Sequence, residues 1–344
     1  MRRKFLSVVL CVCMMLTMAP FAFAAETSVN SYKSLVDAIN NASDGDTITL
    51  AGDIDIEQTV PVTKTITLNL AGYKLYNTKA VWDQPSEDDD NWSLLSVRDN
   101  GDLTITGNGT LQAQENDCYA IDIQSAGAKC TIENGTFVGN IHAVYVEKGI
   151  ANIKGGTYSI QQTYPDSNKA YEFVLNLYDA NRKNGTAKIV VTGGTFVNFD
   201  PANCQAEGIN TNFCAEDYVT IQNKDNSYTV KLLKDIATAR IGDIYYKSLT
   251  DAYAKLPRGN GVAPAEATTI TLLADCAGGG IGSDGDNYMN YVIDFNGHTY
   301  TVGAPAVGST GTVSQGIRVL KGSTAKFMNG TLKAANYNDL VQVV

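Results

Sequence analysis

A short motif returns along this 344-residue chain: an apolar segment, two turn residues, a threonine and a large apolar or aromatic residue. It reads TIENGTFV at 131–138, IKGGTYSI at 153–160 and VTGGTFVN at 191–198. Such a unit is too short to bury its own apolar side chains, so successive copies must stack on one another. The repeat therefore predicts an array of stacked β-strand units.

Each repeat contains two short strands of alternating polarity joined by a polar or Gly-rich turn. The repeats cover residues 93–111, 119–137, 142–158, 173–196 and 316–332. No helical pattern between the strands is long enough for a crossover helix, which argues against a β/α solenoid. The sequence therefore predicts an all-β fold, a parallel β-helix.

The turn of each repeat places a glycine directly before the threonine. These glycines are Gly109, Gly135, Gly156 and Gly194. A sharp turn there calls for positive φ, which glycine adopts without steric cost. The residues two positions later should then point inward and stack at about 4.8 Å. They are Leu111, Phe137, Tyr158 and Phe196. An outward, sugar-binding platform is the alternative, and the leucine in the column argues against it.

A longer repeat divides the chain into two modules. SYKSLVDAINNASDGDTITLAGDI at 31–54 returns as YYKSLTDAYAKL at 245–256, followed by TTITLLADC at 268–276. We predict a first β-helix module at 25–232 and a second at 233–344. The second module stops early relative to the first, so we expect it to be incomplete.

Both modules begin with the pattern of a short amphipathic helix. Ser34 with Asp37, and Ser248 with Asp251, have the spacing of a capping box at a helix start. A helix placed before the first strands would cover the open end of a β-helix, whose unpaired edge groups otherwise invite aggregation. We therefore predict a short capping helix at the start of each module.

Residues 1–24 have the features of a secretory signal peptide. Three basic residues, beginning at Arg2, precede an apolar run, and Ala22-Phe23-Ala24 forms a small-residue cleavage site. The apolar run is too short to span a bilayer, and no later segment offers roughly 18 consecutive apolar residues. We expect a secreted, extracellular chain without a membrane span, free or associated with a cell surface.

The chain is acidic. It has 26 Lys and Arg against 36 Asp and Glu, a formal charge of −10. The charged residues of the predicted signal peptide are all basic, so its removal makes the chain more acidic. Nucleic acid is therefore not an expected partner.

The cysteines beyond the signal peptide leave their redox state open. They are Cys118, Cys130, Cys204, Cys214 and Cys276. Disulfides between Cys204 and Cys214, or Cys118 and Cys130, suit an oxidising compartment, and buried free thiols are the alternative.

Several segments carry a resemblance to a known group of proteins. They are SLVDAINNASDGDTITL, LNLAGYKL, IDFNGHTYT, the NGT and GGT turns, and ARIGDIYYKSLTDAYAKL. The chain resembles the secreted β-helix repeat proteins of gut Firmicutes, in the non-catalytic branch of the pectin-lyase-like superfamily. The resemblance implies a right-handed parallel β-helix in a modular secreted or surface array. It does not fix the chemistry, because that superfamily hosts lyases, hydrolases, adhesins and spacers.

One outward column of the predicted β-helix is the candidate ligand-binding site. It carries Ser96, Asp122, Tyr145 and Asn176 on successive turns, with Arg318 in the second module. Polysaccharide hydrolysis needs two opposed carboxylates, which this column lacks. We predict no catalytic residues and a ligand contact through Asp122, Tyr145 and Asn176. An ordinary solvated face is the alternative.

The neighbouring column places Glu133 beside Lys154, which predicts an exposed ion pair. The histidines, His142 and His298, lie in strand-like segments, and we expect neither to act as a general base.

An acidic loop, DQPSEDDDNW at 83–92, is the candidate metal site. Asp88, Asp89 and Asp90 could hold Ca²⁺ because hard cations prefer clustered oxygen ligands. The loop lacks the alternating spacing of a calcium-binding loop, so a solvated insertion is the alternative. No other cofactor is predicted.

These features predict a non-catalytic binding or adhesion module for carbohydrate or for a host or cell-surface partner, as a monomer or part of a longer array. One alternative is a polysaccharide lyase or glycoside hydrolase that uses Asp122, Tyr145 or Arg182. Another is a structural spacer in a larger surface protein.

Overall fold

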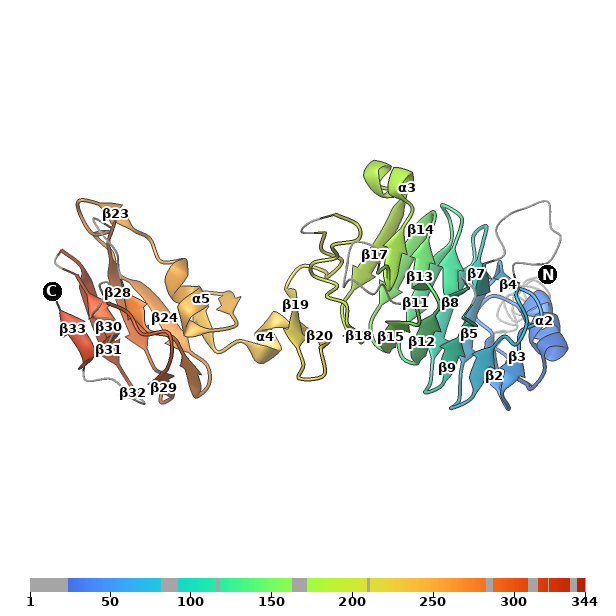
Figure 1. Ribbon diagram of the computed structural model, residues 1–344, viewed down its shortest axis with the longest axis horizontal. Coiled ribbons are helices and arrows are strands. Elements are labelled where there is room, and N and C mark those ends of the chain that lie inside the picture. Colours follow the sequence, from blue (N-terminus) through green and yellow to red (C-terminus); the bar gives the residue numbers. More distant parts are fainter. Residues whose placement is uncertain are drawn as a thin grey trace, which may run out of the picture. The chain divides into compact units, whose positions relative to one another are not determined.

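The computed structural model describes residues 24–81, 92–115, 118–162, 172–208, 211–282, 287–308, 315–320, 322–334 and 339–343. The described chain is mostly β, with parallel sheets (Figure 1). It forms two compact units, Met1–Ala215 with Thr220–Val230 and Glu216–Val219 with Lys231–Val344. Apart from Ala24, the predicted signal peptide lies outside the described residues. None of the described helices has the length and apolar character needed to cross a membrane.

The first unit contains three sheets. Sheet 1 contains β1 (Glu26–Val29), β2 (Thr47–Leu50), β5 (Thr65–Asn69), β8 (Asp102–Thr106), β11 (Lys129–Ile132), β14 (Gly149–Ile153) and β17 (Ala187–Val191). Sheet 2 contains β4 (Val60–Val62), β7 (Ser93–Val97), β10 (Tyr119–Ile123), β13 (His142–Val146) and β16 (Leu175–Leu177). Sheet 3 contains β3 (Ile54–Asp55), β6 (Lys74–Tyr76), β9 (Thr110–Gln112), β12 (Thr136–Gly139), β15 (Thr157–Ile160), β18 (Thr195–Val197), β20 (Ser227–Leu232) and β19 (Tyr218–Gln222).

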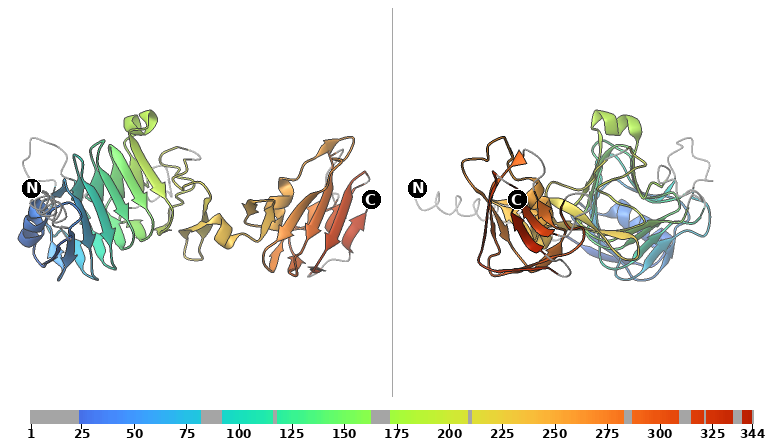
Figure 2. Two further views of the ribbon diagram at one scale, coloured as in Figure 1. Left: turned by 180° about the vertical axis from the view of Figure 1, so that it is seen from behind. Right: turned by 60° about the vertical axis from the view of Figure 1, so that its left-hand side comes forward.

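The chain passes through sheets 1, 3 and 2 in turn. From β2 to β18, each strand pairs in parallel with the strand three places later along the chain. The register keeps equivalent residues opposite one another, as in the row Ile105, Ile132, Ile153. Figure 2 shows these strands following one another in sequence order, from blue to green.

The predicted inward column is confirmed. Phe137 lies opposite Leu111 and Tyr158, and Tyr158 lies opposite Phe196, all with no exposed surface. The Phe137 and Tyr158 ring centroids are 5.1 Å apart, and those of Tyr158 and Phe196 are 4.9 Å apart, with nearly parallel planes. The buried Tyr158 hydroxyl donates to the Gly155 carbonyl at 2.7 Å. The stacked rings fill the interior of the unit.

Glycine serves two different purposes in the turns before this column. Gly135, Gly156 and Gly194 have φ of 119°, 92° and 96°, as predicted. The predicted positive φ at Gly109 is wrong. Glycine is required there because a Cβ would lie 2.5 Å from Leu70 Cβ and 2.5 Å from the Tyr73 carbonyl oxygen.

The predicted helix at the start of the first unit is α2 (Tyr32–Asn41), which buries Leu35 and Ile39. It begins earlier than predicted, so the cap at Ser34 is wrong. The Ser31 hydroxyl accepts from the Ser34 N–H at 3.2 Å, and the Ser34 hydroxyl accepts from the Ser31 N–H at 3.0 Å. Ser31 is therefore the N-cap and Ser34 the third helical residue, while Asp37 pairs with Lys33.

The other end of the first unit satisfies the edge groups of each sheet differently. Leu177 of β16 donates its N–H to Glu207 Oε1 at 2.6 Å. The N–H of Val191 in β17 donates to the Phe213 carbonyl at 2.9 Å. In sheet 3, β18 pairs with the antiparallel β20. The last parallel strand of each sheet therefore has backbone groups bonded to residues that follow the repeats, which limits the unpaired edge.

The second unit repeats this arrangement. One sheet contains β22 (Ile244–Tyr246), β21 (Ala239–Ile241), β24 (Thr268–Leu272), β28 (Asn290–Asp294) and β31 (Thr324–Met328). The others contain β25 (Cys276–Gly278), β29 (Thr299–Val302) and β32 (Thr331–Ala334), and β26 (Ile281–Gly282), β30 (Gln315–Val319) and β33 (Asp339–Val343). The short β23 (Gly259–Asn260) and β27 (Asn287–Tyr288) pair antiparallel.

The second capping helix agrees with its prediction. Helix α5 (Leu249–Ala254) begins after Ser248, whose hydroxyl accepts from the Asp251 N–H at 3.0 Å. Leu249, Ala252 and Tyr253 are buried against the core of this unit. The helix packs beside β21, β22 and β24.

None of the five cysteines beyond residue 24 forms a disulfide, and three of them are buried. The disulfide alternatives, Cys204 with Cys214 and Cys118 with Cys130, are therefore not formed.

Candidate functional site

The predicted outward column lies on sheet 2. Asp122 of β10 is in register with Ser96 of β7 and Tyr145 of β13, and Tyr145 is in register with Asn176 of β16. The structure therefore brings Asp122, Tyr145 and Asn176 onto three adjacent strands of one face, as the repeat alignment predicts.

The alternative of an ordinary solvated face is wrong for half of this column. Asp122 is only 1% exposed and Ser96 is fully buried, whereas Tyr145 and Asn176 are partly exposed. Packing of neighbouring side chains across the strands covers the carboxylate, which strand alternation alone did not predict. The column is therefore a polar site with a buried acid next to accessible groups.

Asp122 is held in an environment that disfavours its charged form. Its Oδ2 accepts from Gln124 Nε2 at 3.0 Å, while Oδ1 is buried with no hydrogen-bond partner. Burial raises the pKa of Asp122 to about 7, against the opposing effects of Ser96, Arg98 and Ser93. Near neutral pH, this carboxyl group is therefore protonated far more often than an ordinary aspartic acid.

Aromatic rings surround the accessible part of the column. We call Trp92, Tyr119, His142, Tyr145 and Phe173 the aromatic cluster. The Tyr145 ring centroid is 5.4 Å from that of Tyr119 and 5.6 Å from that of His142, which stacks on it. Trp92 stacks on Tyr119, and Phe173 meets His142 edge-on. Burial, with nearby Tyr119 and Glu147, raises the pKa of Tyr145, so its hydroxyl stays protonated.

His142 orients the amide of Asn176. Its Nδ1 lies 3.0 Å from the Phe173 carbonyl, which can only accept, so Nδ1 carries the proton. Nε2 is then the acceptor for Asn176 Nδ2, at 3.0 Å. Burial lowers the pKa of His142 to about 4, so the ring is neutral at physiological pH. Its Nε2 lone pair is engaged by Asn176.

The other candidate residues lie elsewhere. Asp88, Asp89 and Asp90 are outside the described residues, and the described part of the chain contains no group of three or more potential metal ligands. Arg182 pairs with Asp179 and Glu207, so it is committed to a structural contact.

Two further predicted positions fall in different surroundings. Arg318 belongs to the second unit, opposite Gly282. The predicted ion pair between Glu133 and Lys154 is confirmed, with an N–O distance of 2.9 Å between exposed side chains.

Sequence reasoning missed the residues that flank the column. Tyr119 is in register with both Ser93 and His142, so continuing the repeat alignment toward the start of each strand would have grouped them. Arg98 and Gln124 each lie two residues after a column member and project to the same side. The register was the signal for Arg98 and Gln124, whereas the offset of three residues from Asp122 to Tyr119 would change faces in a regular strand, so the register groups Tyr119 with His142 but does not place them beside the column.

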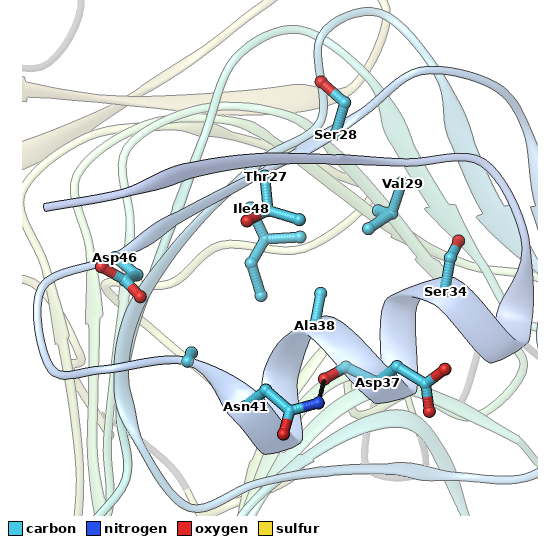
Figure 3. A pocket seen from close by; sticks show the side chains of 10 residues that line it. Thr27, Ser28, Val29, Ser34, Asp37, Ala38, Asn41, Asp46 and Ile48 are labelled. Atoms are coloured by element: carbon cyan, nitrogen blue, oxygen red, sulfur yellow. Dashed lines mark hydrogen bonds between the residues drawn. The ribbon is translucent and has the colours of Figure 1, made fainter.

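A hollow lies between β1 and α2, away from this column, with a volume of about 360 Å³ (Figure 3). It is lined by Thr27, Ser28, Val29, Ser34, Asp37, Ala38, Asn41, Ala42, Asp46 and Ile48. Its acidic groups already have partners, since Asp37 pairs with Lys33 and Asp46 accepts two backbone N–H groups. The hollow therefore contains no acid free to act on a ligand.

The raised pKa of Asp122 predicts a pH-dependent stability difference from Asp122→Asn. A folded-state pKa above the unfolded value favours the folded state at low pH, and that contribution is lost as pH rises from about 4 through about 7. The variant cannot titrate, so the stability of the wild type relative to the variant should fall by about 4 kcal/mol between pH 4 and pH 8, at about 1.4 kcal/mol for each unit of pKa shift. Urea unfolding at several pH values measures this. Parallel pH profiles of the two proteins would contradict it.

Comparisons of the chain with known protein families, curated proteins and solved structures find no match.

Proposed function

We propose that the chain is a secreted or cell-surface, non-catalytic protein that binds carbohydrate. Its units are right-handed parallel β-helices, as in the pectin-lyase-like repeat proteins that the sequence resembles. Support for this architecture comes from three parallel sheets visited in turn, with equivalent residues in register. The ligand lies along the outer face of sheet 2.

The observation that carries the binding proposal is the position of the aromatic cluster beside hydrogen-bonding groups. A sugar ring has apolar C–H faces that pack on aromatic rings and hydroxyl groups that need polar partners. Tyr145 supplies a partly exposed ring and a protonated hydroxyl, and Asn176 supplies an amide whose orientation His142 fixes. A site with rings and a few fixed polar groups is typical of small-ligand recognition.

Burial of Asp122 favours binding over cleavage. A general acid or base must come within hydrogen-bond reach of the scissile bond. The Asp122 side chain is 1% exposed, so a glycosidic oxygen cannot reach it while its neighbours stay in place. The Asp122 residue instead lies buried in the column, in register with Ser96 on one side and Tyr145 on the other.

A glycan array followed by calorimetry with the bound glycan tests this proposal. Tyr145→Ala should weaken binding at least about tenfold, because it removes both a stacking surface and a hydroxyl. Tyr73→Ala is the matched control, since Tyr73 is an exposed tyrosine in the turn between β5 and β6.

The same preparation should be assayed for depolymerisation of acidic and neutral polysaccharides. Absence of any glycan signal would reject the binding proposal in favour of a spacer. Cleavage that Asp122→Asn abolishes would reject it in favour of an enzyme.

A further inference from the structure

The start of β1 is tied to a carboxylate. The backbone N–H of Ala25 donates to Asp46 Oδ1 at 2.8 Å, and the Ala25 carbonyl accepts from the Thr47 N–H at 2.8 Å. Ala25 is also the first residue after the predicted signal peptide, whose cleavage site is Ala22-Phe23-Ala24. Cleavage there would convert the Ala25 nitrogen from an amide into a charged ammonium group at the start of β1.

We propose that Asp46 is the counter-ion of the processed N-terminus, so that removal of the signal peptide creates an ion pair that fastens β1 to the first unit. The proposal depends on the predicted cleavage site and is independent of carbohydrate binding. A hydrogen bond from an ionised donor to an ionised acceptor is stronger than one from a neutral amide.

Other contacts already hold Asp46 in position in the unprocessed chain. Its Oδ2 accepts from the Ser43 N–H at 2.8 Å, and its own carbonyl accepts from the Thr67 N–H at 2.9 Å. The N–H groups of Ala25 and Ser43 lower the pKa of Asp46, so the carboxylate is ionised at neutral pH. Its position is thus fixed from two sides, with Oδ1 directed at the start of β1.

The surroundings favour a cation. The hollow beside this contact is lined by Asp46 and Asp37 and by no Lys or Arg (Figure 3). Asp37 pairs with Lys33 on the exposed side of α2. Two other nearby acids have partners, since Glu26 accepts from the Thr49 hydroxyl and Asp44 accepts from the Thr65 N–H. Asp46 is therefore the acid positioned for the ammonium group.

The second unit provides an internal comparison. Aligning DTITL at 46–50 with TTITL at 268–272 puts Thr268 at the place of Asp46. The strand beside this segment, β21, runs antiparallel to β24, whereas β1 runs parallel to β2. The second unit follows the first within the chain, so signal-peptide removal creates no amino group at its start. It has Thr268 in place of Asp46. This difference is expected if Asp46 serves a processed terminus.

The first test is the intact mass of protein secreted from the full-length precursor. A mature chain that begins at Ala25 is expected. A chain that begins at any other residue would overturn the proposal.

The second test is an NMR titration of the Ala25 amino group in the processed protein. Pairing with Asp46 should raise its pKa by about half a unit to one unit above the ordinary 7.7–8.0. Asp46→Asn should remove most of this rise, and Asp37→Asn is the matched control. An unshifted pKa, or a rise that Asp46→Asn leaves intact, would overturn the proposal.

N-terminal acetylation provides a variant that keeps the N–H donor and removes only the charge. It should lower the melting temperature below about pH 7.7, where the raised pKa of the amine contributes fully, and the effect should fade as pH rises through the folded-state pKa. Equal melting temperatures at pH 6 would count against the ion pair even if Asp46→Asn failed to fold.

Discussion

Phe137→Ala should lower the free energy of unfolding of the first unit by about 4 kcal/mol. The ring is fully buried and stacks on Tyr158 at 5.1 Å, with Leu111 on its other side. Its removal leaves a cavity that a parallel register cannot close, because each neighbour is fixed by its own strand. Urea unfolding followed by tryptophan fluorescence measures the change, since Trp92 belongs to this unit.

The matched control is Val138→Ala on the same strand. Val138 alternates outward and is partly exposed, so its truncation should cost less than about 1 kcal/mol. Similar losses from the two substitutions would mean that the interior column does not dominate the stability of the unit.

Glu207→Ala should destabilise the first unit by about 3 kcal/mol. The Glu207 side chain is 2% exposed, and it joins the Leu177 N–H to Arg182 Nε, with the ion pair at 3.0 Å. Alanine would leave an unsatisfied N–H on the edge strand β16 and a guanidinium without its buried partner. The same fluorescence-monitored unfolding gives the measurement.

Two comparisons separate the parts of this effect. Glu207→Gln keeps an acceptor for Leu177 but loses the charge, so it should fall between wild type and alanine. Glu133→Ala removes an exposed ion pair and should cost less than about 1 kcal/mol. A loss from Glu207→Ala no larger than that from Glu133→Ala would show that β16 does not need this cover.

The repetitive part of the structure could be predicted from the sequence because equivalent positions in successive repeats have the same environment. Phe137, Tyr158 and Phe196 follow the same turn, so each copy supports the same assignment, and all three rings are buried as expected. The column of Asp122, Tyr145 and Asn176 follows from the same alignment.

The predictions were wrong where the role or burial of a residue is set by contacts with residues outside its own repeat. Ser34 has the spacing of an N-cap, but Ser31 competes for that role through two reciprocal hydrogen bonds. The burial of Asp122 depends on side chains from other turns, and so does the tautomer of His142, whose partners lie 31 and 34 residues away. Strand alternation indicates which side a residue faces, but it does not show how deeply the neighbouring turns cover it.

The pairing of each strand with the third strand after it has an evolutionary consequence. One circuit of the first unit runs from Tyr119 to the residue before His142, and Tyr119 lies opposite His142. A duplication or loss of that many codons rejoins the chain in phase, so the capping elements at the two ends need not change. The number of strands in sheet 2 can then change by one for each repeat gained or lost, while insertions of other lengths are confined to the loops between strands.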